Sequence, residues 1–173
     1  VTREMMDSAL DYSDTAIVVY SRNGGEGGDL PMDMAEFQNG DEGKSYLELQ
    51  DIELNLLEKV KLAGFKNVIV LINSSNAMEL GFLNDEEVTA ALWIGGPGST
   101  GNGAIGQILN GTINPSGRLA DTYAYDLSTA PAYYNAGDFA YLNGKHELGP
   151  KTDYFKFLNY SEGIYVGYRF YET

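Results

Sequence analysis

The stretch "TAIVVY", residues 15–20, is a short, fully apolar run that is rich in β-branched side chains. Such a run is typical of a strand buried in a parallel sheet. Two similar runs follow it, "NVIVLINSS" at residues 67–75 and "AALWIGG" at residues 90–96. We therefore predict a parallel core of three strands, at residues 16–20, 68–72 and 91–94.

Helical patterns separate these strands. Between the first two runs, apolar residues recur at spacings that place them on one helix face: Leu49, Ile52, Leu56, Leu57, Val60 and Ala63. Ser45 and Glu48 fit a capping box at the start of this helix, and Gly64 is a suitable C-cap. Residues 5–12 and the stretch "GNGAIGQILNG", residues 101–111, are also expected to be helical. Strands that alternate with helices predict an α/β domain with a mostly parallel sheet, arranged in three layers.

The last third of the chain differs from the part before it. Gly, Asn, Pro and Tyr are frequent at residues 130–149, which predicts a long irregular excursion. The tail "YSEGIYVGYRFYET" alternates around Ile164, Val166, Tyr168 and Phe170, which is the pattern of an edge strand.

Composition excludes several classes of function. The chain has 173 residues, of which 43% are hydrophobic, and this indicates a globular domain rather than a disordered segment. It carries 11 Lys and Arg against 25 Asp and Glu, a net charge of -14. Such a surface repels nucleic acid and anionic membranes, so we expect neither as a partner. The absence of cysteine excludes disulfides and thiolate metal sites.

Nucleotide and metal sites have weak support. Residues 101–106 match G-x-G-x-x-G, but six residues, Pro97 among them, separate this match from the preceding strand. The alternative is that Gly103 and Gly106 allow close packing of a helix on the sheet. The acidic clusters at residues 41–42 and 85–87 lack the spacing of a ligand loop, and His146 is the only histidine. We therefore expect no cofactor and no metal.

The stretch "SRNGGEGGDLP", residues 21–31, is the remaining candidate site. It leaves the first predicted strand and surrounds Glu26 with four glycines, with Asp29 three residues further on. In a parallel sheet, loops at the carboxyl ends of the strands form the ligand crevice. A single Glu on a loop is nevertheless more often an ordinary surface residue, so position alone does not make Glu26 functional.

Four stretches together resemble the second domain of family 3 glycoside hydrolases of the β-glucosidase type. They are "YSRNGGEGGDLP", "LINSSNAMEL", "NGTINPSGRLADTYA" and "YSEGIYVGYRFYET", and the resemblance extends from about residue 14 to the end of the chain. It implies a flavodoxin-like α/β sandwich domain preceded, in the whole enzyme, by a (β/α)8 barrel that carries a nucleophilic Asp. The opening strand and helix of the sandwich lack counterparts and the chain begins with Val1, so we expect a single partial domain, residues 1–173, without the barrel.

The resemblance also implies a role for Glu26. Many family members carry a general acid/base Glu in a Gly-Glu-Gly-x-Asp loop, and that pattern falls on residues 25–29. Glu26 would then act on a β-glycoside substrate together with the barrel of the same enzyme, while Asp29 either orients the loop or caps a helix. The family motif usually has Arg where this chain has Leu30. A non-catalytic structural or sugar-binding module therefore remains the alternative.

Overall fold

The computed structural model describes residues 1–24, 30–135, 139–148 and 151–172. The chain divides into two compact units, Val1–Tyr125 and Asp126–Thr173, which are described separately below. The expectation of a single partial domain over residues 1–173 stays a prediction. Among the described residues, no helix is long and apolar enough to cross a membrane.

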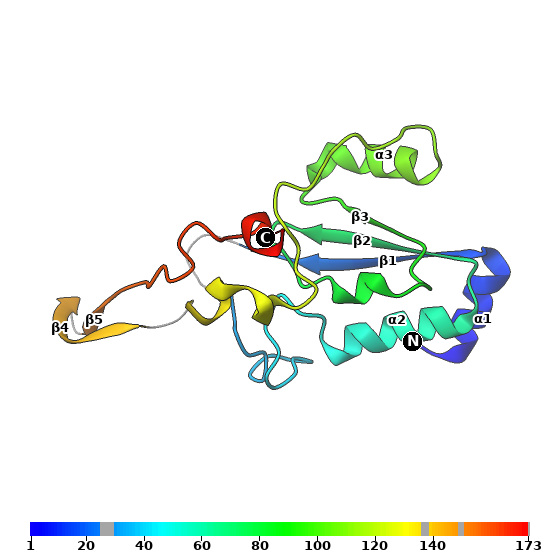
Figure 1. Cartoon of the computed structure of the whole chain (residues 1–173). Helices are drawn as coiled ribbons and strands as arrows, with labels where there is room; N and C mark the ends of the chain where they lie inside the picture. Colours follow the sequence, from blue (N-terminus) through cyan, green and yellow to red (C-terminus); the bar gives the residue numbers. More distant parts are fainter. Residues whose placement is uncertain (25–29, 136–138, 149–150, 173) are drawn as a thin grey trace. The chain divides into compact units, whose positions relative to one another are not determined.

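The first unit is built on a parallel sheet of three strands (Figure 1). These are β1 (Thr15–Arg22), β2 (Asn67–Ser74) and β3 (Ala90–Trp93), in the order β1-β2-β3. Val18 is the partner of Val70, which is in turn the partner of Ala91. The three apolar runs therefore form the predicted strands, in one sheet and all parallel.

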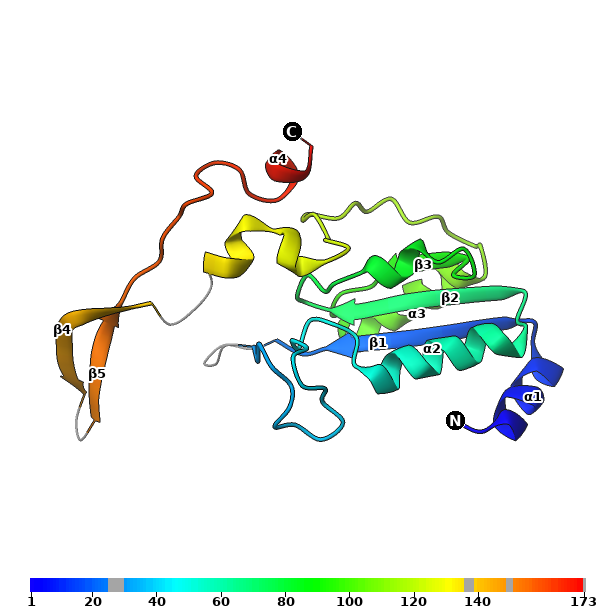
Figure 2. The same cartoon turned by 60° about the horizontal axis from the view of Figure 1, so that its bottom comes forward.

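Helices lie on both faces of this sheet. The helices are α1 (Arg3–Tyr12), α2 (Asp51–Ala63) and α3 (Gly98–Leu109). In both views α2 covers one face of the sheet and α3 lies on the opposite side, while α1 lies beside the amino-terminal ends of the strands (Figures 1 and 2). This arrangement confirms the α/β class and the three layers.

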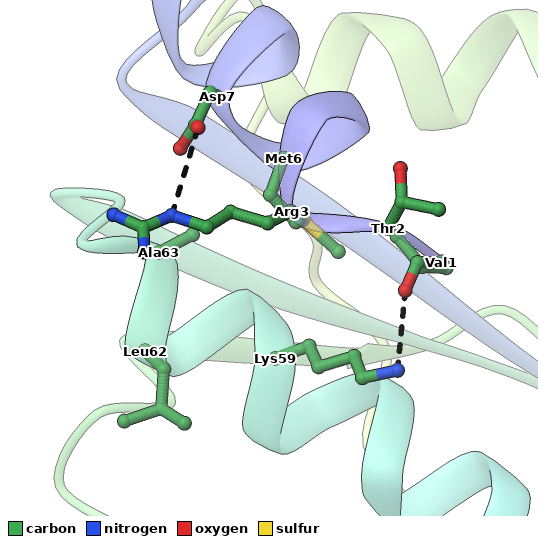
Figure 3. A pocket seen from close by; sticks show the side chains of 8 residues that line it. All are labelled: Val1, Thr2, Arg3, Met6, Asp7, Lys59, Leu62 and Ala63. Atoms are coloured by element: carbon green, nitrogen blue, oxygen red, sulfur yellow. Dashed lines mark hydrogen bonds and ion pairs between the residues drawn. The ribbon is translucent and has the colours of Figure 1, made fainter.

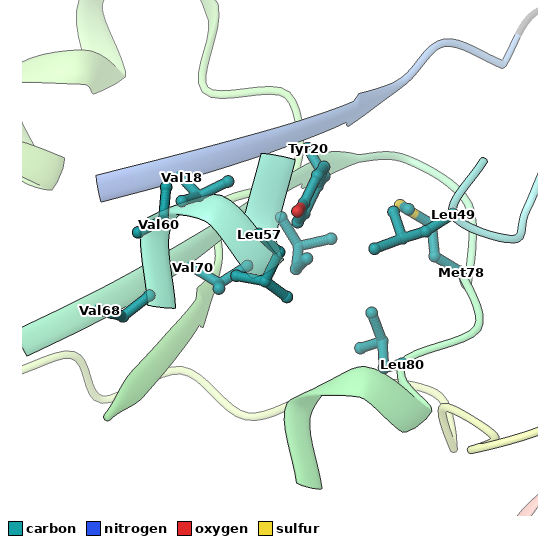
Figure 4. Close-up of a cluster of buried hydrophobic side chains, with 10 residues drawn as sticks. Val18, Tyr20, Leu49, Leu57, Val60, Val68, Val70, Met78 and Leu80 are labelled. Atoms are coloured by element: carbon teal, nitrogen blue, oxygen red, sulfur yellow. The ribbon is translucent and has the colours of Figure 1, made fainter. Parts of the chain in front are cut away.

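The hydrophobic core lies between α2 and the sheet (Figure 4). Leu57 and Val60 of α2 are buried against inward-facing side chains of β1 and β2, and Met78 is fully buried. Tyr20 completes one end of the core, where its ring meets Phe82 edge to face at 5.6 Å. Each fully buried aliphatic side chain of this kind stabilises the fold by about 1.5–3 kcal/mol. The full set of core residues is Val18, Tyr20, Leu49, Leu57, Val60, Val68, Val70, Ile72, Met78 and Leu80.

The start of α2 corrects the sequence prediction, whereas its end confirms it. The helix is capped by Gln50, whose side chain and that of Glu53 form a capping box. At the predicted start, the Ser45 amide does donate to the Glu48 carboxylate at 2.7 Å, but no helix follows. Gly64 ends α2 in the left-handed conformation, with φ 86°, as predicted.

The second unit differs from the prediction in two places. Its elements are the 3₁₀ helices η2 (Leu127–Thr129) and η3 (Pro131–Asn135), the strands β4 (Ala140–Leu148) and β5 (Lys151–Lys156), and the short helix α4 (Tyr168–Tyr171). β4 and β5 pair antiparallel, so the prediction of an irregular excursion over residues 130–149 is wrong for residues 140–148. The predicted edge strand in the tail is also wrong, because Gly163 and Gly167 have positive φ and turn the chain.

Candidate active site at the carboxyl edge of the sheet

The three strands end at one edge of the sheet, where parallel sheets bind their ligands. β1 ends at Arg22, whose partner Ser74 is the last residue of β2. The predicted site residues Glu26 and Asp29 follow β1 closely in the chain, but both lie outside the described residues. The structure describes the residues on either side of their segment, up to residue 24 and from residue 30.

Arg22 is a buried cation at this edge, with 6% of its side chain exposed. Its guanidinium makes a bidentate contact with the Glu53 carboxylate, with Nη1–Oε1 at 2.7 Å and Nη2–Oε2 at 2.5 Å. The remaining donors reach the backbone carbonyls of Ser21, Tyr46 and Glu48, at 2.9, 2.5 and 2.8 Å. A buried charge is tolerated only when it is paired and hydrogen-bonded, and this one is both.

Tyr46 lies beside Arg22 and contacts both flanks of the segment that bears Glu26. The guanidinium carbon of Arg22 is 5.4 Å from the centre of the Tyr46 ring, which is a cation–π distance. The Tyr46 hydroxyl accepts a hydrogen bond from the amide of Asn23 at 2.9 Å. The Tyr46 amide donates to the carbonyl of Pro31, also at 2.9 Å.

The amino-terminal end of α2 holds the partner of Arg22. The Glu53 carboxylate also accepts from the Gln50 amide at 2.9 Å, so one side chain serves the ion pair and the helix cap. Tyr20 donates its hydroxyl to the Glu53 carbonyl at 3.1 Å. Burial, and then the negative charge of Glu53, raise the pKa of Tyr20 to about 12, while Arg22 lowers it slightly.

Asn76 borders the same edge from the end of β2. Its backbone is fixed by the Ser74 hydroxyl, which donates to the Asn76 carbonyl at 2.8 Å and accepts from its amide at 3.0 Å. The Asn76 side chain packs so closely on Gly24 that a Cβ there would come within 2.5 Å of its amide nitrogen. Only glycine fits at position 24 without displacing Asn76. The indole of Trp93 donates to the Ser74 carbonyl at 2.9 Å and ties β3 to the same corner.

The dinucleotide match does not have the geometry of a fingerprint. Residues 101–106 lie inside α3, which begins after Pro97, whereas the fingerprint needs its first glycine between the strand and the helix. The alternative role in packing is also wrong, because a Cβ at Gly103 or Gly106 would meet no atom within 4 Å.

The acidic clusters are parts of ion pairs. Asp85 and Glu87 approach the ammonium of Lys61 at 2.5 and 3.4 Å, and Asp41 approaches that of Lys44 at 3.4 Å. The hydrogen bond from Lys61 lowers the pKa of Asp85. Among residues 1–24, 30–135, 139–148 and 151–172, no group of three or more His, Cys, Asp or Glu could hold a metal ion.

A hollow of about 450 Å³ lies between α1 and α2, away from the carboxyl edge (Figure 3). Lys59 donates to the carbonyl of Val1 at 3.1 Å on one side of it, and Arg3 pairs with Asp7 at 3.8 Å on the other. The Arg3–Asp7 pair is largely exposed.

Sequence reasoning missed Arg22, Tyr46, Glu53 and Asn76. One signal was available for the first of them, because Arg22 continues the period-two alternation of Val18 and Tyr20 and so belongs on their buried face. Tyr46 comes from a loop, Glu53 from a helix and Asn76 from the bend that follows β2, and no local sequence pattern joins these three residues to β1.

Comparison with known proteins assigns this α/β domain to a family. A family model described as the glycosyl hydrolase family 3 C-terminal domain matches residues 2–168. The chain therefore belongs to this family.

Curated relatives agree with the assignment. The chain is 30% identical over 169 residues to a β-glucosidase of Ruminococcus albus, covering 98% of this chain and 15% of the relative. It is 32% identical over 183 residues to β-glucosidase A of Butyrivibrio fibrisolvens, covering 98% and 20%. It is 28% identical over 138 residues to thermostable β-glucosidase B of Acetivibrio thermocellus, covering 80% and 16%. The chain thus spans a fifth or less of the length of these relatives.

Proposed function

We propose that this chain is the part of a retaining β-glycosidase that supplies the general acid/base, and that Glu26 is this residue. The observation that carries the proposal is the position of the Gly25-Glu26-Gly27-x-Asp29 pattern. In the sequence this pattern begins three residues after Arg22, and Arg22 is the residue with which β1 ends at the carboxyl edge of the parallel sheet, where ligands bind. The family membership and the names of the relatives support this reading.

The chemistry requires two carboxyl groups about 5 Å apart in a retaining glycosidase. One attacks the sugar and the other protonates the leaving oxygen, then removes a proton from the attacking water. Glu26 takes the second role. The nucleophile lies outside this chain, on a (β/α)8 barrel of the same enzyme, and the substrate is a terminal non-reducing β-linked sugar held between the two domains.

The protonation state of Glu26 depends on this partner. A general acid must carry its proton when the bond breaks, and the negative charge of a nearby nucleophile favours the protonated form. Exclusion of water by bound sugar acts in the same direction. Asp29, three residues further on, is proposed to orient the segment rather than to exchange protons with the substrate.

Azide rescue tests the proposal in an enzyme that carries this chain after a family 3 barrel. In Glu26→Ala the glycosyl-enzyme is hydrolysed slowly, because no base activates the attacking water. Azide needs no such base and can attack in place of water. We expect azide to accelerate the variant on an activated aryl β-glucoside and to yield the β-glucosyl azide. The matched variant Asp29→Ala should give no azide product. Rescue of Asp29→Ala but not of Glu26→Ala would transfer the acid/base role to Asp29.

The isolated chain is expected to be inactive on aryl β-glycosides. General acid/base assistance contributes about 10²–10⁴-fold, and it acts only on a substrate that is bound and oriented. Turnover by highly purified chain that disappears in Glu26→Gln would contradict the division of the site between two domains.

A further inference from the structure

Both flanks of the segment that bears Glu26 are attached to the same residue, Tyr46. On the entry side, the hydroxyl of Tyr46 accepts from the Asn23 amide at 2.9 Å. On the return side, its own amide donates to the Pro31 carbonyl at 2.9 Å. Tyr46 is fifteen residues further along the chain than Pro31, so these bonds are tertiary contacts rather than parts of one local turn.

Tyr46 is itself held in place by a buried charge. Its carbonyl accepts from Nε of Arg22 at 2.5 Å, and its ring lies 5.4 Å from the guanidinium carbon. Arg22 in turn is locked by its bidentate contact with Glu53 at the start of α2. The sheet and α2 therefore fix Arg22, and Arg22 fixes Tyr46. Tyr46 in turn holds Asn23 and Pro31, on either side of the segment.

The sequence of the segment makes such anchoring necessary. Glycine occupies three of the five positions from 25 to 29, and glycine adds no Cβ restraint to the backbone. Where a catalytic carboxyl stands then depends on where the ends of its segment are fixed. Misplacement of a reacting group by about 1 Å can cost about 10²-fold in rate.

We infer that Tyr46 is a positioning residue for the general acid/base, acting by holding Asn23 and Pro31 on either side of the segment that bears Glu26. Tyr46 touches neither substrate nor proton in this role. The inference rests on the proposed function of Glu26, and the experiment below separates the two.

Tyr46→Phe is the sharpest variant, because it removes only the hydroxyl that accepts from Asn23. The ring, its contact with Arg22 and both backbone hydrogen bonds remain. Tyr12→Phe is the matched control, since Tyr12 is 93% exposed at the end of α1 and makes no contact with this edge.

The first measurement uses the 173-residue chain itself. Amide hydrogen exchange resolved by NMR should show the Asn23 amide exchanging about tenfold faster in Tyr46→Phe than in wild type, with the core amides of β2 unchanged. Tyr12→Phe should match wild type. Equal exchange of Asn23 in all three proteins would overturn the inference, because the hydroxyl would then hold nothing.

The second measurement uses an enzyme that carries this chain after a family 3 barrel, with aryl β-glucosides of rising leaving-group pKa. In Tyr46→Phe, kcat/KM should fall about 5- to 50-fold for poor leaving groups and less than about twofold for dinitrophenolate, since only poor leaving groups need the proton. A uniform loss across the series, or no loss, would overturn the positioning role. Glu26→Gln is measured in parallel: if it shows the selective loss and Tyr46→Phe does not, the inference alone fails. If Glu26→Gln itself shows no selectivity, the proposed function fails.

Discussion

Replacing Glu53 with glutamine leaves the guanidinium of Arg22 buried without a carboxylate partner. Breaking a buried ion pair by removing one partner costs about 3–5 kcal/mol. Two features reduce this figure here: 25% of the Glu53 side chain is exposed, and Arg22 keeps three backbone carbonyl acceptors. The glutamine oxygen can also still accept from the Gln50 amide and preserve the helix cap. We therefore expect Glu53→Gln to lower the free energy of unfolding by about 2 kcal/mol.

The assay is urea unfolding followed by tryptophan fluorescence. Trp93 is the only tryptophan of the chain and lies in β3, so its emission reports the first unit alone. With a urea m-value of about 1–3 kcal/mol per molar, the midpoint should fall by about 1 M. Glu58→Gln is the matched control on the same helix, because Glu58 is 58% exposed and its pair with Lys61 should contribute less than about 1 kcal/mol. Equal midpoints for the two variants would refute the reasoning that the Arg22 pair is a buried anchor.

Three further predictions concern the same unit. Ile72→Ala should lower the free energy of unfolding by about 2–5 kcal/mol in urea titrations, because Ile72 is 1% exposed and its truncation leaves a cavity in the core. The pKa of Tyr20 is about 12 in the fold and about 10 when unfolded, so stability should fall as pH rises from 10 to 12. Tyr20→Phe should make that fall shallower in urea midpoints measured against pH, and an unchanged slope would count against the burial of this phenol. The Lys61 contact lowers the pKa of Asp85 below its ordinary 3.8, so its stabilisation is present above that pH and is lost below it. Asp85→Asn should therefore flatten the decline of the thermal unfolding midpoint below pH 4, and an unaltered acid decline would assign it to other carboxyls.

The sequence predicted the sheet because its signal is local. Short apolar runs of this kind are typical of strands in a parallel sheet, and the structure contains all three in one parallel sheet. Only β2 is a central strand, and Ile17 and Val19 of the edge strand β1 are about half exposed. The signal for the end of α2 was equally local, since Gly64 adopts a left-handed conformation that favours glycine. The start of α2 was not predictable in this way, because the sequence contains two successive capping patterns, Ser45 with Glu48 and Gln50 with Glu53. Only the second is followed by the helix.

The second unit was predicted poorly because its hydrophobic pattern does not indicate that β4 and β5 pair. β4 contains Asn143, Gly144 and Lys145, which are depleted in strands, yet it pairs with β5. In the tail, four alternating apolar residues suggested a strand, but two glycines with positive φ interrupt it. Pairing with β5 therefore decided the first element, and local glycine turns decided the second.

In the candidate site, too, local sequence signals could be predicted and contacts between distant parts of the chain could not. A short motif was enough to select Glu26 and Asp29, and their roles stay predictions. The residues that border them could not be selected, because Tyr46 reaches the site from a loop and Glu53 from a helix. The one sequence feature that pointed to Arg22 was its spacing from Val18, which places it on the same, buried face of the strand.

The most direct test of the account compares two substrates of an enzyme that carries this chain after a family 3 barrel. For a β-linked disaccharide, whose leaving group needs a proton, kcat/KM should fall by about 10²–10⁴-fold in Glu26→Ala. For a dinitrophenyl β-glycoside, whose leaving group does not, it should stay within a few-fold of wild type. If the mutation slows both substrates equally, or slows neither, Glu26 is not the general acid/base and the central claim is contradicted.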